Sequence, residues 1–374
     1  MPSWSSADPV RVGLIGAGSA SRAYLRTLDS MVVAGSALEG PVCDRRPESR
    51  AALLARRPAT HAVATAEEVV DSDVDLVVIT TAPDSHAELT RRALESGKHV
   101  LVEKPLAADV DVARGLVALA RERHLLLVVA PFVQLSPPFR MLWTWVQSGV
   151  LGDVHSARAM YGNAGASWAA WYHTSGVGPL GDLAVYNIKS LTALLGPVVE
   201  VRCLQSRSSV VRDLPDEAAE PDPDVVHLTL RHASGATSVV MASHAVWAYR
   251  RPAIELYGSE GSANLLGDDW DPEGVEVYRA DWGHWRSSAS PDRTWNWTDG
   301  LRTAVDALRT GEAAALDLNH DLHVLDVVVA GRGSAARDGV AVPVASRFGP
   351  LHLSYDVPQG VTHVHDHTRP LAEQ

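Results

Sequence analysis

In the first third of the chain, strand-like apolar runs alternate with stretches whose apolar residues have helical spacing. Short runs that are almost entirely apolar occur at 11–16, 41–44, 61–65, 75–81, 99–103 and 125–130. Stretches with helical spacing of apolar positions lie between them, at 20–29, 47–56, 66–71, 86–96 and 110–124. Strands that are apolar on both faces are typical of a parallel sheet covered by helices on both sides. The pattern therefore predicts a doubly wound α/β domain of the Rossmann type over residues 1–131.

Beyond this point apolar and polar residues alternate instead. The strand-like stretches are 155–162, 198–207, 225–232 and 237–247. Helical spacing occurs at 137–149, 181–195, 301–310 and 319–336. Strands with one apolar and one polar face are typical of an antiparallel sheet that is covered on one side. The pattern predicts an α+β domain over 132–374, built on a large, mostly antiparallel open sheet.

Composition and charge restrict the partners of this protein. The 374 residues carry a formal net charge of −12, which argues against nucleic acid or a membrane surface, because both attract basic patches. The chain has no apolar run of transmembrane length and no signal-peptide core. Only Cys43 and Cys203 are present, too few for a disulfide framework or a zinc cluster. We therefore expect a cytoplasmic protein without a bound metal.

A glycine-rich segment, GLIGAGSASRAYL, joins the first apolar run to the first helical stretch. Gly16 permits a tight turn and Gly18 lets the backbone approach a diphosphate at the helix N-terminus, although Ser21 replaces the usual third glycine. Asp44, at the end of the second strand, can bind the ribose hydroxyls of NAD. Arg45 or Arg46 could instead hold the extra phosphate of NADP, or both could lie in a solvated loop. We predict NAD, with NADP as the alternative. The expected contacts here are Gly16, Gly18, Ser19, Ala20, Asp44 and Arg45.

The segment KHVLVEKPLA ends a buried strand with a charged turn of Glu103, Lys104 and Pro105. Ligands bind at the carboxyl ends of the strands in such parallel sheets. An ammonium group at that position can polarise a carbonyl group or exchange a proton. The alternative is a surface ion pair between Lys104 and Glu103.

These segments together resemble the Gfo/Idh/MocA family of NAD(P)-dependent oxidoreductases. The resemblance rests on GLIGAG, CDRR, TTAPDSHAEL, KHVLVEKPLA and GPLGDLAVYNIKSL, and spans about residues 10–350. It implies hydride transfer on sugars or cyclitols, and a large sheet that often mediates oligomerisation, so we expect a homo-oligomer, a dimer or tetramer. It places Lys104 beside the nicotinamide, before a proline that is commonly cis. The further cofactor contacts that it implies are Thr81, Ala82, Pro83, His86, Glu103, Lys104 and Pro105.

The segment GDLAVYNIK carries the candidates for substrate chemistry. On a helix, Asp182 and Tyr186 share one face, and Lys189 lies near Tyr186. The family frequently has D-x-G-x-H-x-x-D here, so Asp182 matches, Tyr186 replaces the histidine and Lys189 replaces the last aspartate. Relatives with tyrosine use it for proton transfer, which makes Lys104, Asp182 and Tyr186 the predicted catalytic residues. The alternatives are a packing role for Tyr186 and a solvent-facing Lys189, and for Lys189 we favour solvent exposure.

Aromatic and polar residues before this helix suit a carbohydrate. The sequence has eleven tryptophans and only three phenylalanines. Trp168 and Trp171 lie in a loop-like stretch and could stack on a sugar face, although burial in a core is the commoner use of tryptophan. Tyr161, Asn163 and His173 flank the same stretch and could donate hydrogen bonds to substrate.

Two groups of histidines do not change this interpretation. His320 and His323 are spaced as neighbours on a helix, and His363, His365 and His367 alternate in the tail. Neither group is accompanied by a carboxylate arrangement typical of a metal site, so we expect them to be structural or solvated.

The sequence leaves three functions open. The first is an NAD(P)-dependent dehydrogenase or ketoreductase acting on a sugar, glycoside or cyclitol. The second is a lyase or glycosidase that oxidises its sugar transiently with bound NAD. The third is an inactive binding or sensor protein, against which the presence of Lys104 and Asp182 argues.

Overall fold

The computed structural model describes residues 8–165, 173, 177–209, 222–250, 252–289, 295–312 and 316–353. The chain divides into two compact units. The first comprises the described residues up to Phe132 together with Asn296–Leu322, and the second comprises Val133–Trp295 together with the described residues from His323 onward.

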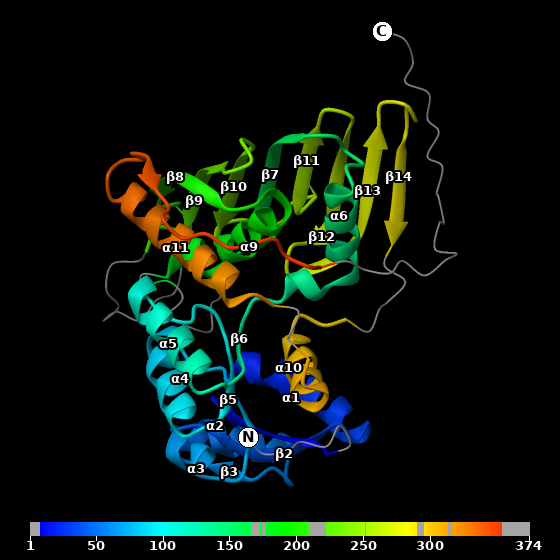
Figure 1. The fold of residues 1–374 in the computed structure, drawn as a ribbon. Helices are drawn as coiled ribbons and strands as arrows, with labels where there is room; N and C mark the ends of the chain where they lie inside the picture. Colours follow the sequence, from blue (N-terminus) through cyan, green and yellow to red (C-terminus); the bar gives the residue numbers. More distant parts are fainter. Residues whose placement is uncertain are drawn as a thin grey trace. The chain divides into compact units, whose positions relative to one another are not determined.

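The first unit contains a six-stranded sheet in the order β3-β2-β1-β4-β5-β6, and every strand pair in it is parallel (Figure 1). This order and direction confirm the predicted Rossmann domain. The strands are β1 (Val10–Ile15), β2 (Ala37–Cys43), β3 (Ala62–Val63), β4 (Leu76–Ile79), β5 (His99–Val102) and β6 (Leu127–Val129).

Helices cover the faces of this sheet. Helix α1 packs with α10, whereas α4 packs with α3 and with α5. Their bounds are α1 (Ser19–Val33), α2 (Pro47–Arg56), α3 (Ala66–Val70), α4 (His86–Glu95), α5 (Val110–Glu122) and α10 (Gly300–Thr310). The segment before α10 is held to α1, because Thr27 Oγ1 and Thr298 Oγ1 lie 2.6 Å apart and the ring of Trp297 stands edge-on to Tyr24.

The second unit contains a nine-stranded sheet in the order β14-β13-β12-β11-β7-β10-β9-β8-β15. Among the described strands of this sheet only β7 and β10 pair in parallel, which confirms a large, mostly antiparallel sheet. The strands are β7 (Val154–Gly162), β8 (Val198–Ser206), β9 (Val225–His232), β10 (Thr237–Ser243), β11 (Ile254–Gly258), β12 (Gly261–Asp268), β13 (Asp271–Arg279), β14 (Trp285–Ala289) and β15 (Val342–Pro343).

Helices of this unit lie against one face of its sheet (Figure 1). Helix α9 packs on β7 and β10, α8 packs on β9 and β10, and α6 packs on β12 and β13. Burial alternates along the strands, as in β9, where every second residue faces the helices. The bounds are α6 (Pro137–Gln147), α8 (Gly178–Asp182), α9 (Ala184–Leu195) and α11 (Leu318–Ala335), the last of which crosses the division between the units.

Strands β11 to β14 were not predicted from the sequence. Their apolar residues are interrupted by glycines and charged residues; in β12, for example, only Ala263 and Leu265 are fully buried. Residues 210–221, which include most of the Pro- and Asp-rich stretch 213–224, lie outside the described residues, as does the tail with His363, His365 and His367.

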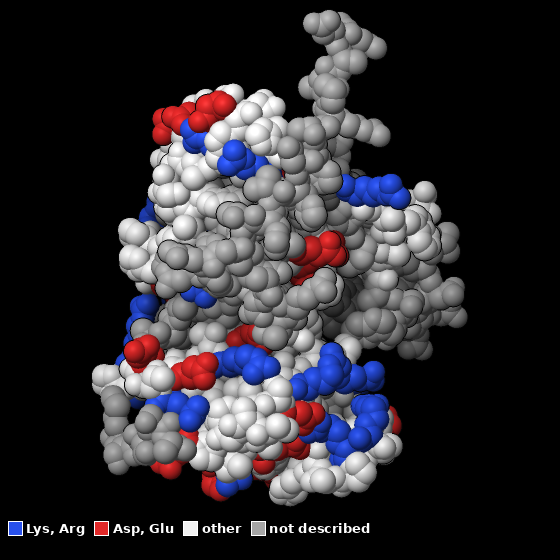
Figure 2. All heavy atoms as spheres, turned by 90° about the vertical axis from the view of Figure 1, so that its right-hand side faces the viewer, with Lys and Arg blue, Asp and Glu red and all other residues white. Residues whose placement is uncertain are grey.

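The surface charge and the hydropathy of the helices bear on possible partners. Figure 2 shows one face of the molecule, on which basic and acidic side chains of the described residues are interspersed. No helix among the described residues is long and apolar enough to cross a membrane.

A buried histidine joins α11 to β8. The Nε2 of His323 accepts a hydrogen bond from the backbone N–H of Val198 at 2.9 Å, so its Nδ1 carries the proton and faces Ser346 Oγ at 2.9 Å. Burial lowers the pKa of His323 to about 4. Protonation would therefore abolish the bond to Val198.

We predict that this histidine makes the protein less stable in acid. The unfolded chain binds the proton near pH 6.5 and the folded chain only near pH 4, so the free energy of unfolding should fall as pH drops through this window, by up to about 3 kcal/mol. Urea unfolding of wild type and His323→Gln, whose amide cannot titrate, measures this. The stability advantage of wild type should shrink as pH falls; a difference that is constant from pH 7 to pH 4.5 would contradict the assignment.

Candidate active site

The glycine-rich loop between β1 and α1 is held between two neighbouring strands. Gly16 has φ +104°, and a Cβ there would lie 2.8 Å from the backbone of Thr80, so only glycine fits. Its N–H donates to the carbonyl of Cys43 at 2.8 Å, and its own carbonyl accepts from Thr80 Oγ1 at 2.9 Å. The hydroxyl of Ser21, in place of the usual third glycine, donates to the Gly18 carbonyl at 2.6 Å.

The loop suits a diphosphate. Helix α1 begins at Ser19, has no side-chain cap and has no acidic residue in its first turn. A Cβ built on Gly18 would meet nothing within 4 Å, so the backbone there is open to approach. The N–H groups and the dipole of α1 can therefore accept an anion.

Asp44 is fixed beside this loop. Its Oδ2 accepts from the backbone N–H of Ala17 at 3.0 Å, and its Oδ1 accepts from the N–H of Arg46 at 3.0 Å. Burial acts to raise the pKa of Asp44, but these backbone hydrogen bonds and the Arg46 guanidinium hold it below its usual value. Asp44 is thus an ionised carboxylate next to the glycine loop, as the ribose of NAD requires, and Arg45 is exposed.

The ends of β4 and β5 are joined by His86. Its ring is 1% exposed, with Nδ1 2.8 Å from the Pro105 carbonyl and Nε2 3.0 Å from the Thr81 carbonyl. Ala82 and Pro83 lie in the intervening turn. We predicted that His86 contacts the cofactor; in the structure its ring connects two segments predicted to line the cofactor site.

The Glu103 carboxylate is buried within the first unit. Its Oε1 accepts from Tyr24 Oη at 2.8 Å, and its Oε2 accepts from the backbone N–H of Lys104 at 3.2 Å. The Lys104–Pro105 peptide bond is cis, as the resemblance implies. These contacts fix the backbone of the turn that carries Lys104 at the carboxyl end of β5.

In the second unit, the helix predicted at 181–195 with Asp182 and Tyr186 on one face is divided in two, because α8 ends at Asp182 and α9, which carries Tyr186, begins at Ala184. Asp182 ends α8, is 6% exposed, and its Oδ2 lies 3.1 Å from Nε2 of His244, just after β10. The ring of His173 stands edge-on to His244 at 5.7 Å. The structure therefore brings Asp182 and His173 together through His244, a residue that sequence reasoning missed because no motif marks a histidine after a strand.

Tyr186 and Tyr161 form an aromatic pair. Their ring centroids are 5.6 Å apart at an interplanar angle of 81°, which joins α9 to β7. Asn163 is exposed, and its Oδ1 accepts from the N–H of Gly165 at 2.9 Å. Trp168 and Trp171, the predicted sugar platform, lie outside the described residues.

Lys189 is buried, contrary to the expectation that it faces solvent. Its residue is 1% exposed, because α9 is buried on almost all sides between the sheet and its neighbouring helices. The amphipathic pattern therefore misassigned it. A buried ammonium requires polar partners, so Lys189 belongs to the polar interior of this unit.

The same helix is fixed by a buried carboxylate. Asp269, fully buried between β12 and β13, accepts from Asn187 Nδ2 at 2.6 Å and from Ser190 Oγ at 2.7 Å. Burial raises its pKa to about 6. Asp269 thus positions the helix that carries Tyr186. Among the described residues, no group of three or more His, Cys, Asp or Glu side chains is arranged to hold a metal ion.

Comparison with known families gives two matches. Residues 10–130 match the model for an oxidoreductase family with an NAD-binding Rossmann fold, and residues 139–264 match the model for the GFO/IDH/MocA C-terminal domain. The first match covers the parallel sheet, and the second covers strands of the mostly antiparallel sheet.

Individual proteins are similar over much of their length. The chain is 31% identical over 257 residues to dTDP-3,4-didehydro-2,6-dideoxy-alpha-D-glucose 3-reductase of Saccharopolyspora spinosa, covering 68% of this chain and 73% of the reductase. It is 26% identical over 277 residues to inositol 2-dehydrogenase of Rhizobium meliloti, covering 73% and 79%. The solved structure of levoglucosan dehydrogenase with NADH and levoglucosan has TM-score 0.79 at 21% identity, covering 91% of this chain and 100% of that one, and supports the fold.

We predict that Asp44→Asn weakens NADH binding about tenfold, the effect of losing a hydrogen bond to a charged acceptor, and narrows discrimination against NADPH. Fluorescence titration of the variant with each cofactor measures both effects. The matched control is Glu48→Gln, which removes an exposed carboxylate from the first turn of α2. Equal losses in the two variants would show that Asp44 acts only through net charge.

Proposed function

Because the chain belongs to the Gfo/Idh/MocA family of NAD-binding Rossmann oxidoreductases, we propose that it is an NAD-dependent dehydrogenase or ketoreductase of a sugar, glycoside or cyclitol. The observation that supports this most directly lies in the first unit. The glycine loop contacts Thr80 after β4, and His86 connects the next residue, Thr81, to Pro105. The glycine loop after β1 and the Lys104 turn after β5 thus lie at the carboxyl ends of two strands that both pair with β4.

In the proposed chemistry the cofactor accepts the hydride and protein side chains handle the substrate oxygen and its proton. NAD, when bound, supplies the hydride acceptor at its nicotinamide. The Lys104 ammonium polarises the substrate oxygen, and the Tyr186 hydroxyl exchanges a proton with that oxygen. Tyrosine with a pKa near 10 is a poor base at neutral pH, and a nearby ammonium would favour its phenolate. Asp182 orients the groups on α8 and α9.

The proposed substrate class follows from the relatives. Their names specify a dTDP-linked dideoxyglucose, levoglucosan and inositol, and we propose that this chain acts on a carbinol or ketone of a related polyhydroxylated ring. Tyr161, Asn163 and His173 supply polar groups for such a ring, with Trp168 and Trp171 as the proposed stacking surface.

The direct test is a panel of sugars, glycosides and cyclitols with NAD or NADP, followed by absorbance of the reduced cofactor. We expect oxidation of at least one polyol with NAD and a higher kcat/KM than with NADP. Substrate consumed without accumulation of reduced cofactor would favour the transient-oxidation lyase or glycosidase. No turnover at all would favour the binding protein.

We predict that Lys104→Ala lowers turnover at least a hundredfold, because a polarising or acid–base group contributes on the order of 10²–10⁴ in rate. The Kd for NADH, measured by fluorescence, should change little, since the glycine loop is untouched. A variant with near-normal turnover would assign Lys104 a structural role only.

We predict that Tyr186→Phe lowers kcat by about two orders of magnitude, because it removes the proton-transfer hydroxyl and keeps the ring packed against Tyr161. The reciprocal change Tyr161→Phe should mainly raise KM. Wild-type oxidation should increase with pH through an ionisation that Tyr186→Phe lacks. Unchanged activity and pH profile in Tyr186→Phe would assign proton transfer to Lys104 or His173.

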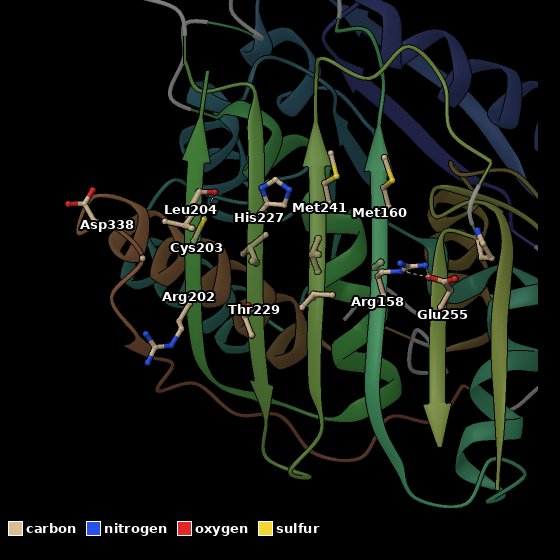
Figure 3. A pocket seen from close by; sticks show the side chains of 16 residues that line it. Arg158, Met160, Arg202, Cys203, Leu204, His227, Thr229, Met241, Glu255 and Asp338 are labelled. Atoms are coloured by element: carbon tan, nitrogen blue, oxygen red, sulfur yellow. Dashed lines mark hydrogen bonds and ion pairs between the residues drawn. The ribbon is translucent and has the colours of Figure 1, made fainter. Parts of the chain in front are cut away.

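We also propose that the open face of the nine-stranded sheet binds a second copy of this chain. A hollow of about 560 Å³ lies on this face, and Leu204, His227, Met241 and Met160 project from adjacent strands around it (Figure 3). Leu204 is 58% and Val239 44% exposed, and exposed apolar side chains gathered on one face are candidates for a protein interface. A symmetric pair would place the same surface on both subunits.

Sedimentation velocity tests this surface. Wild type should sediment as a dimer or tetramer, and the double variant Leu204→Glu/Val239→Glu should dissociate, because like charges would meet in the interface. Leu54→Glu is the control, since Leu54 is a 39% exposed apolar residue on α2 of the first unit. A monomeric wild type would contradict the proposal.

A further inference from the structure

His244 and Asp182 form a carboxylate–imidazole pair inside the second unit. Their residues are 62 positions apart and lie in different elements, yet Nε2 of His244 is 3.1 Å from Oδ2 of Asp182. His244 is 1% exposed and Asp182 is 6% exposed. A buried carboxylate needs hydrogen-bond donors, and the imidazole supplies one.

The backbone around the pair is fixed by a segment that precedes β9. The N–H of His244 donates to the Asp224 carbonyl at 2.9 Å, and so does Ser243 Oγ at 2.9 Å. The N–H of Asp222 donates to the His173 carbonyl at 2.6 Å. The Asp224 carboxylate is engaged by the N–H and hydroxyl of Ser208, each at 2.6 Å. His244 therefore stands in a defined position with few ways to turn away from Asp182.

The His244–Asp182 pair gains its interest from Tyr186, which replaces a histidine of the pattern that this segment resembles. The pattern that this segment resembles places a histidine four residues after the aspartate, on the same helix face. Here that position is Tyr186, whose ring packs edge-on against Tyr161. An imidazole nevertheless reaches Asp182, and it comes from the end of β10 instead of from the helix itself.

We propose that His244 is a positioning residue for the reaction: its Nε2–H donates to Asp182 Oδ2 and sets the orientation of that carboxylate at the junction of α8 and α9. This rests on the proposed function. Tyr186 lies four residues after Asp182, in the first turn of α9, so an error in the carboxylate's position would be transmitted across this junction to the predicted proton-transfer group. A displacement of this kind lowers turnover more than it lowers affinity.

Two substitutions separate the donor from the ring. His244→Gln places an amide Nε2 near the position of the imidazole Nε2, whereas His244→Leu fills the space without a donor. We expect His244→Leu to lower kcat ten- to hundredfold with the Kd for NADH unchanged, and His244→Gln to keep kcat within about threefold of wild type. Circular dichroism confirms that both variants are folded.

Two kinetic results would overturn the proposal. Full kcat in His244→Leu would mean that the pair serves packing alone. A His244→Gln enzyme as slow as His244→Leu would mean that the imidazole does more than donate one hydrogen bond.

Nitrogen-15 spectra of histidine-labelled protein test the pair without any substrate. The His244 signal, assigned by its loss in His244→Gln, should report a protonated Nε2 and should shift in Asp182→Asn but little in Tyr186→Phe. A His244 signal that is the same in Asp182→Asn and wild type would overturn the pair. A wild type inactive on every carbohydrate would contradict the proposed function, and the spectra would still decide whether His244 holds Asp182.

Discussion

The first unit depends on the close approach of Gly16 to the backbone of Thr80. The loop after β1 lies between the ends of β2 and β4, with a hydrogen bond to each, and no side chain fits in the gap. This contact fixes the loop that leads into α1, in which the Ala17 N–H donates to Asp44. The positive end of a helix and an ionised carboxylate are thereby placed side by side, which is the charge pattern that a dinucleotide with a diphosphate and free ribose hydroxyls requires.

In the second unit, buried polar groups determine where α8 and α9 sit. An apolar interface alone would let a helix slide or rotate at modest energetic cost, whereas the bonds from Asp269 to Asn187 and Ser190 specify one position. Burying Asp269 is unfavourable for its charged form, as its raised pKa indicates. The unit therefore gives up some stability at neutral pH for a fixed placement of the segment with Asp182 and Tyr186.

Much of the first unit could be predicted because its signals are local. Each strand of the parallel sheet is a short apolar run, and each is followed by a helical pattern. The cofactor residues follow from glycines and an aspartate at strand ends. No local pattern marks β11 to β14, whose buried residues are interrupted by glycines and charged residues. Nor does any local pattern show that α9 is buried on nearly all sides with Lys189 inside. The approach of His244 to Asp182 depends on the register of β10 beside β7, which only the assembled sheet defines.

The account predicts that the protein moves a hydride from a carbinol carbon to NAD, and isotopic labelling tests this most directly. A substrate identified in the panel would be deuterated at its carbinol carbon and incubated with NAD, and the reduced cofactor analysed by proton NMR. The account predicts deuterium at C4 of the nicotinamide in proportion to the ketone formed. Product that retains all of its deuterium, or that forms while the cofactor gains none, would contradict net hydride transfer by this protein.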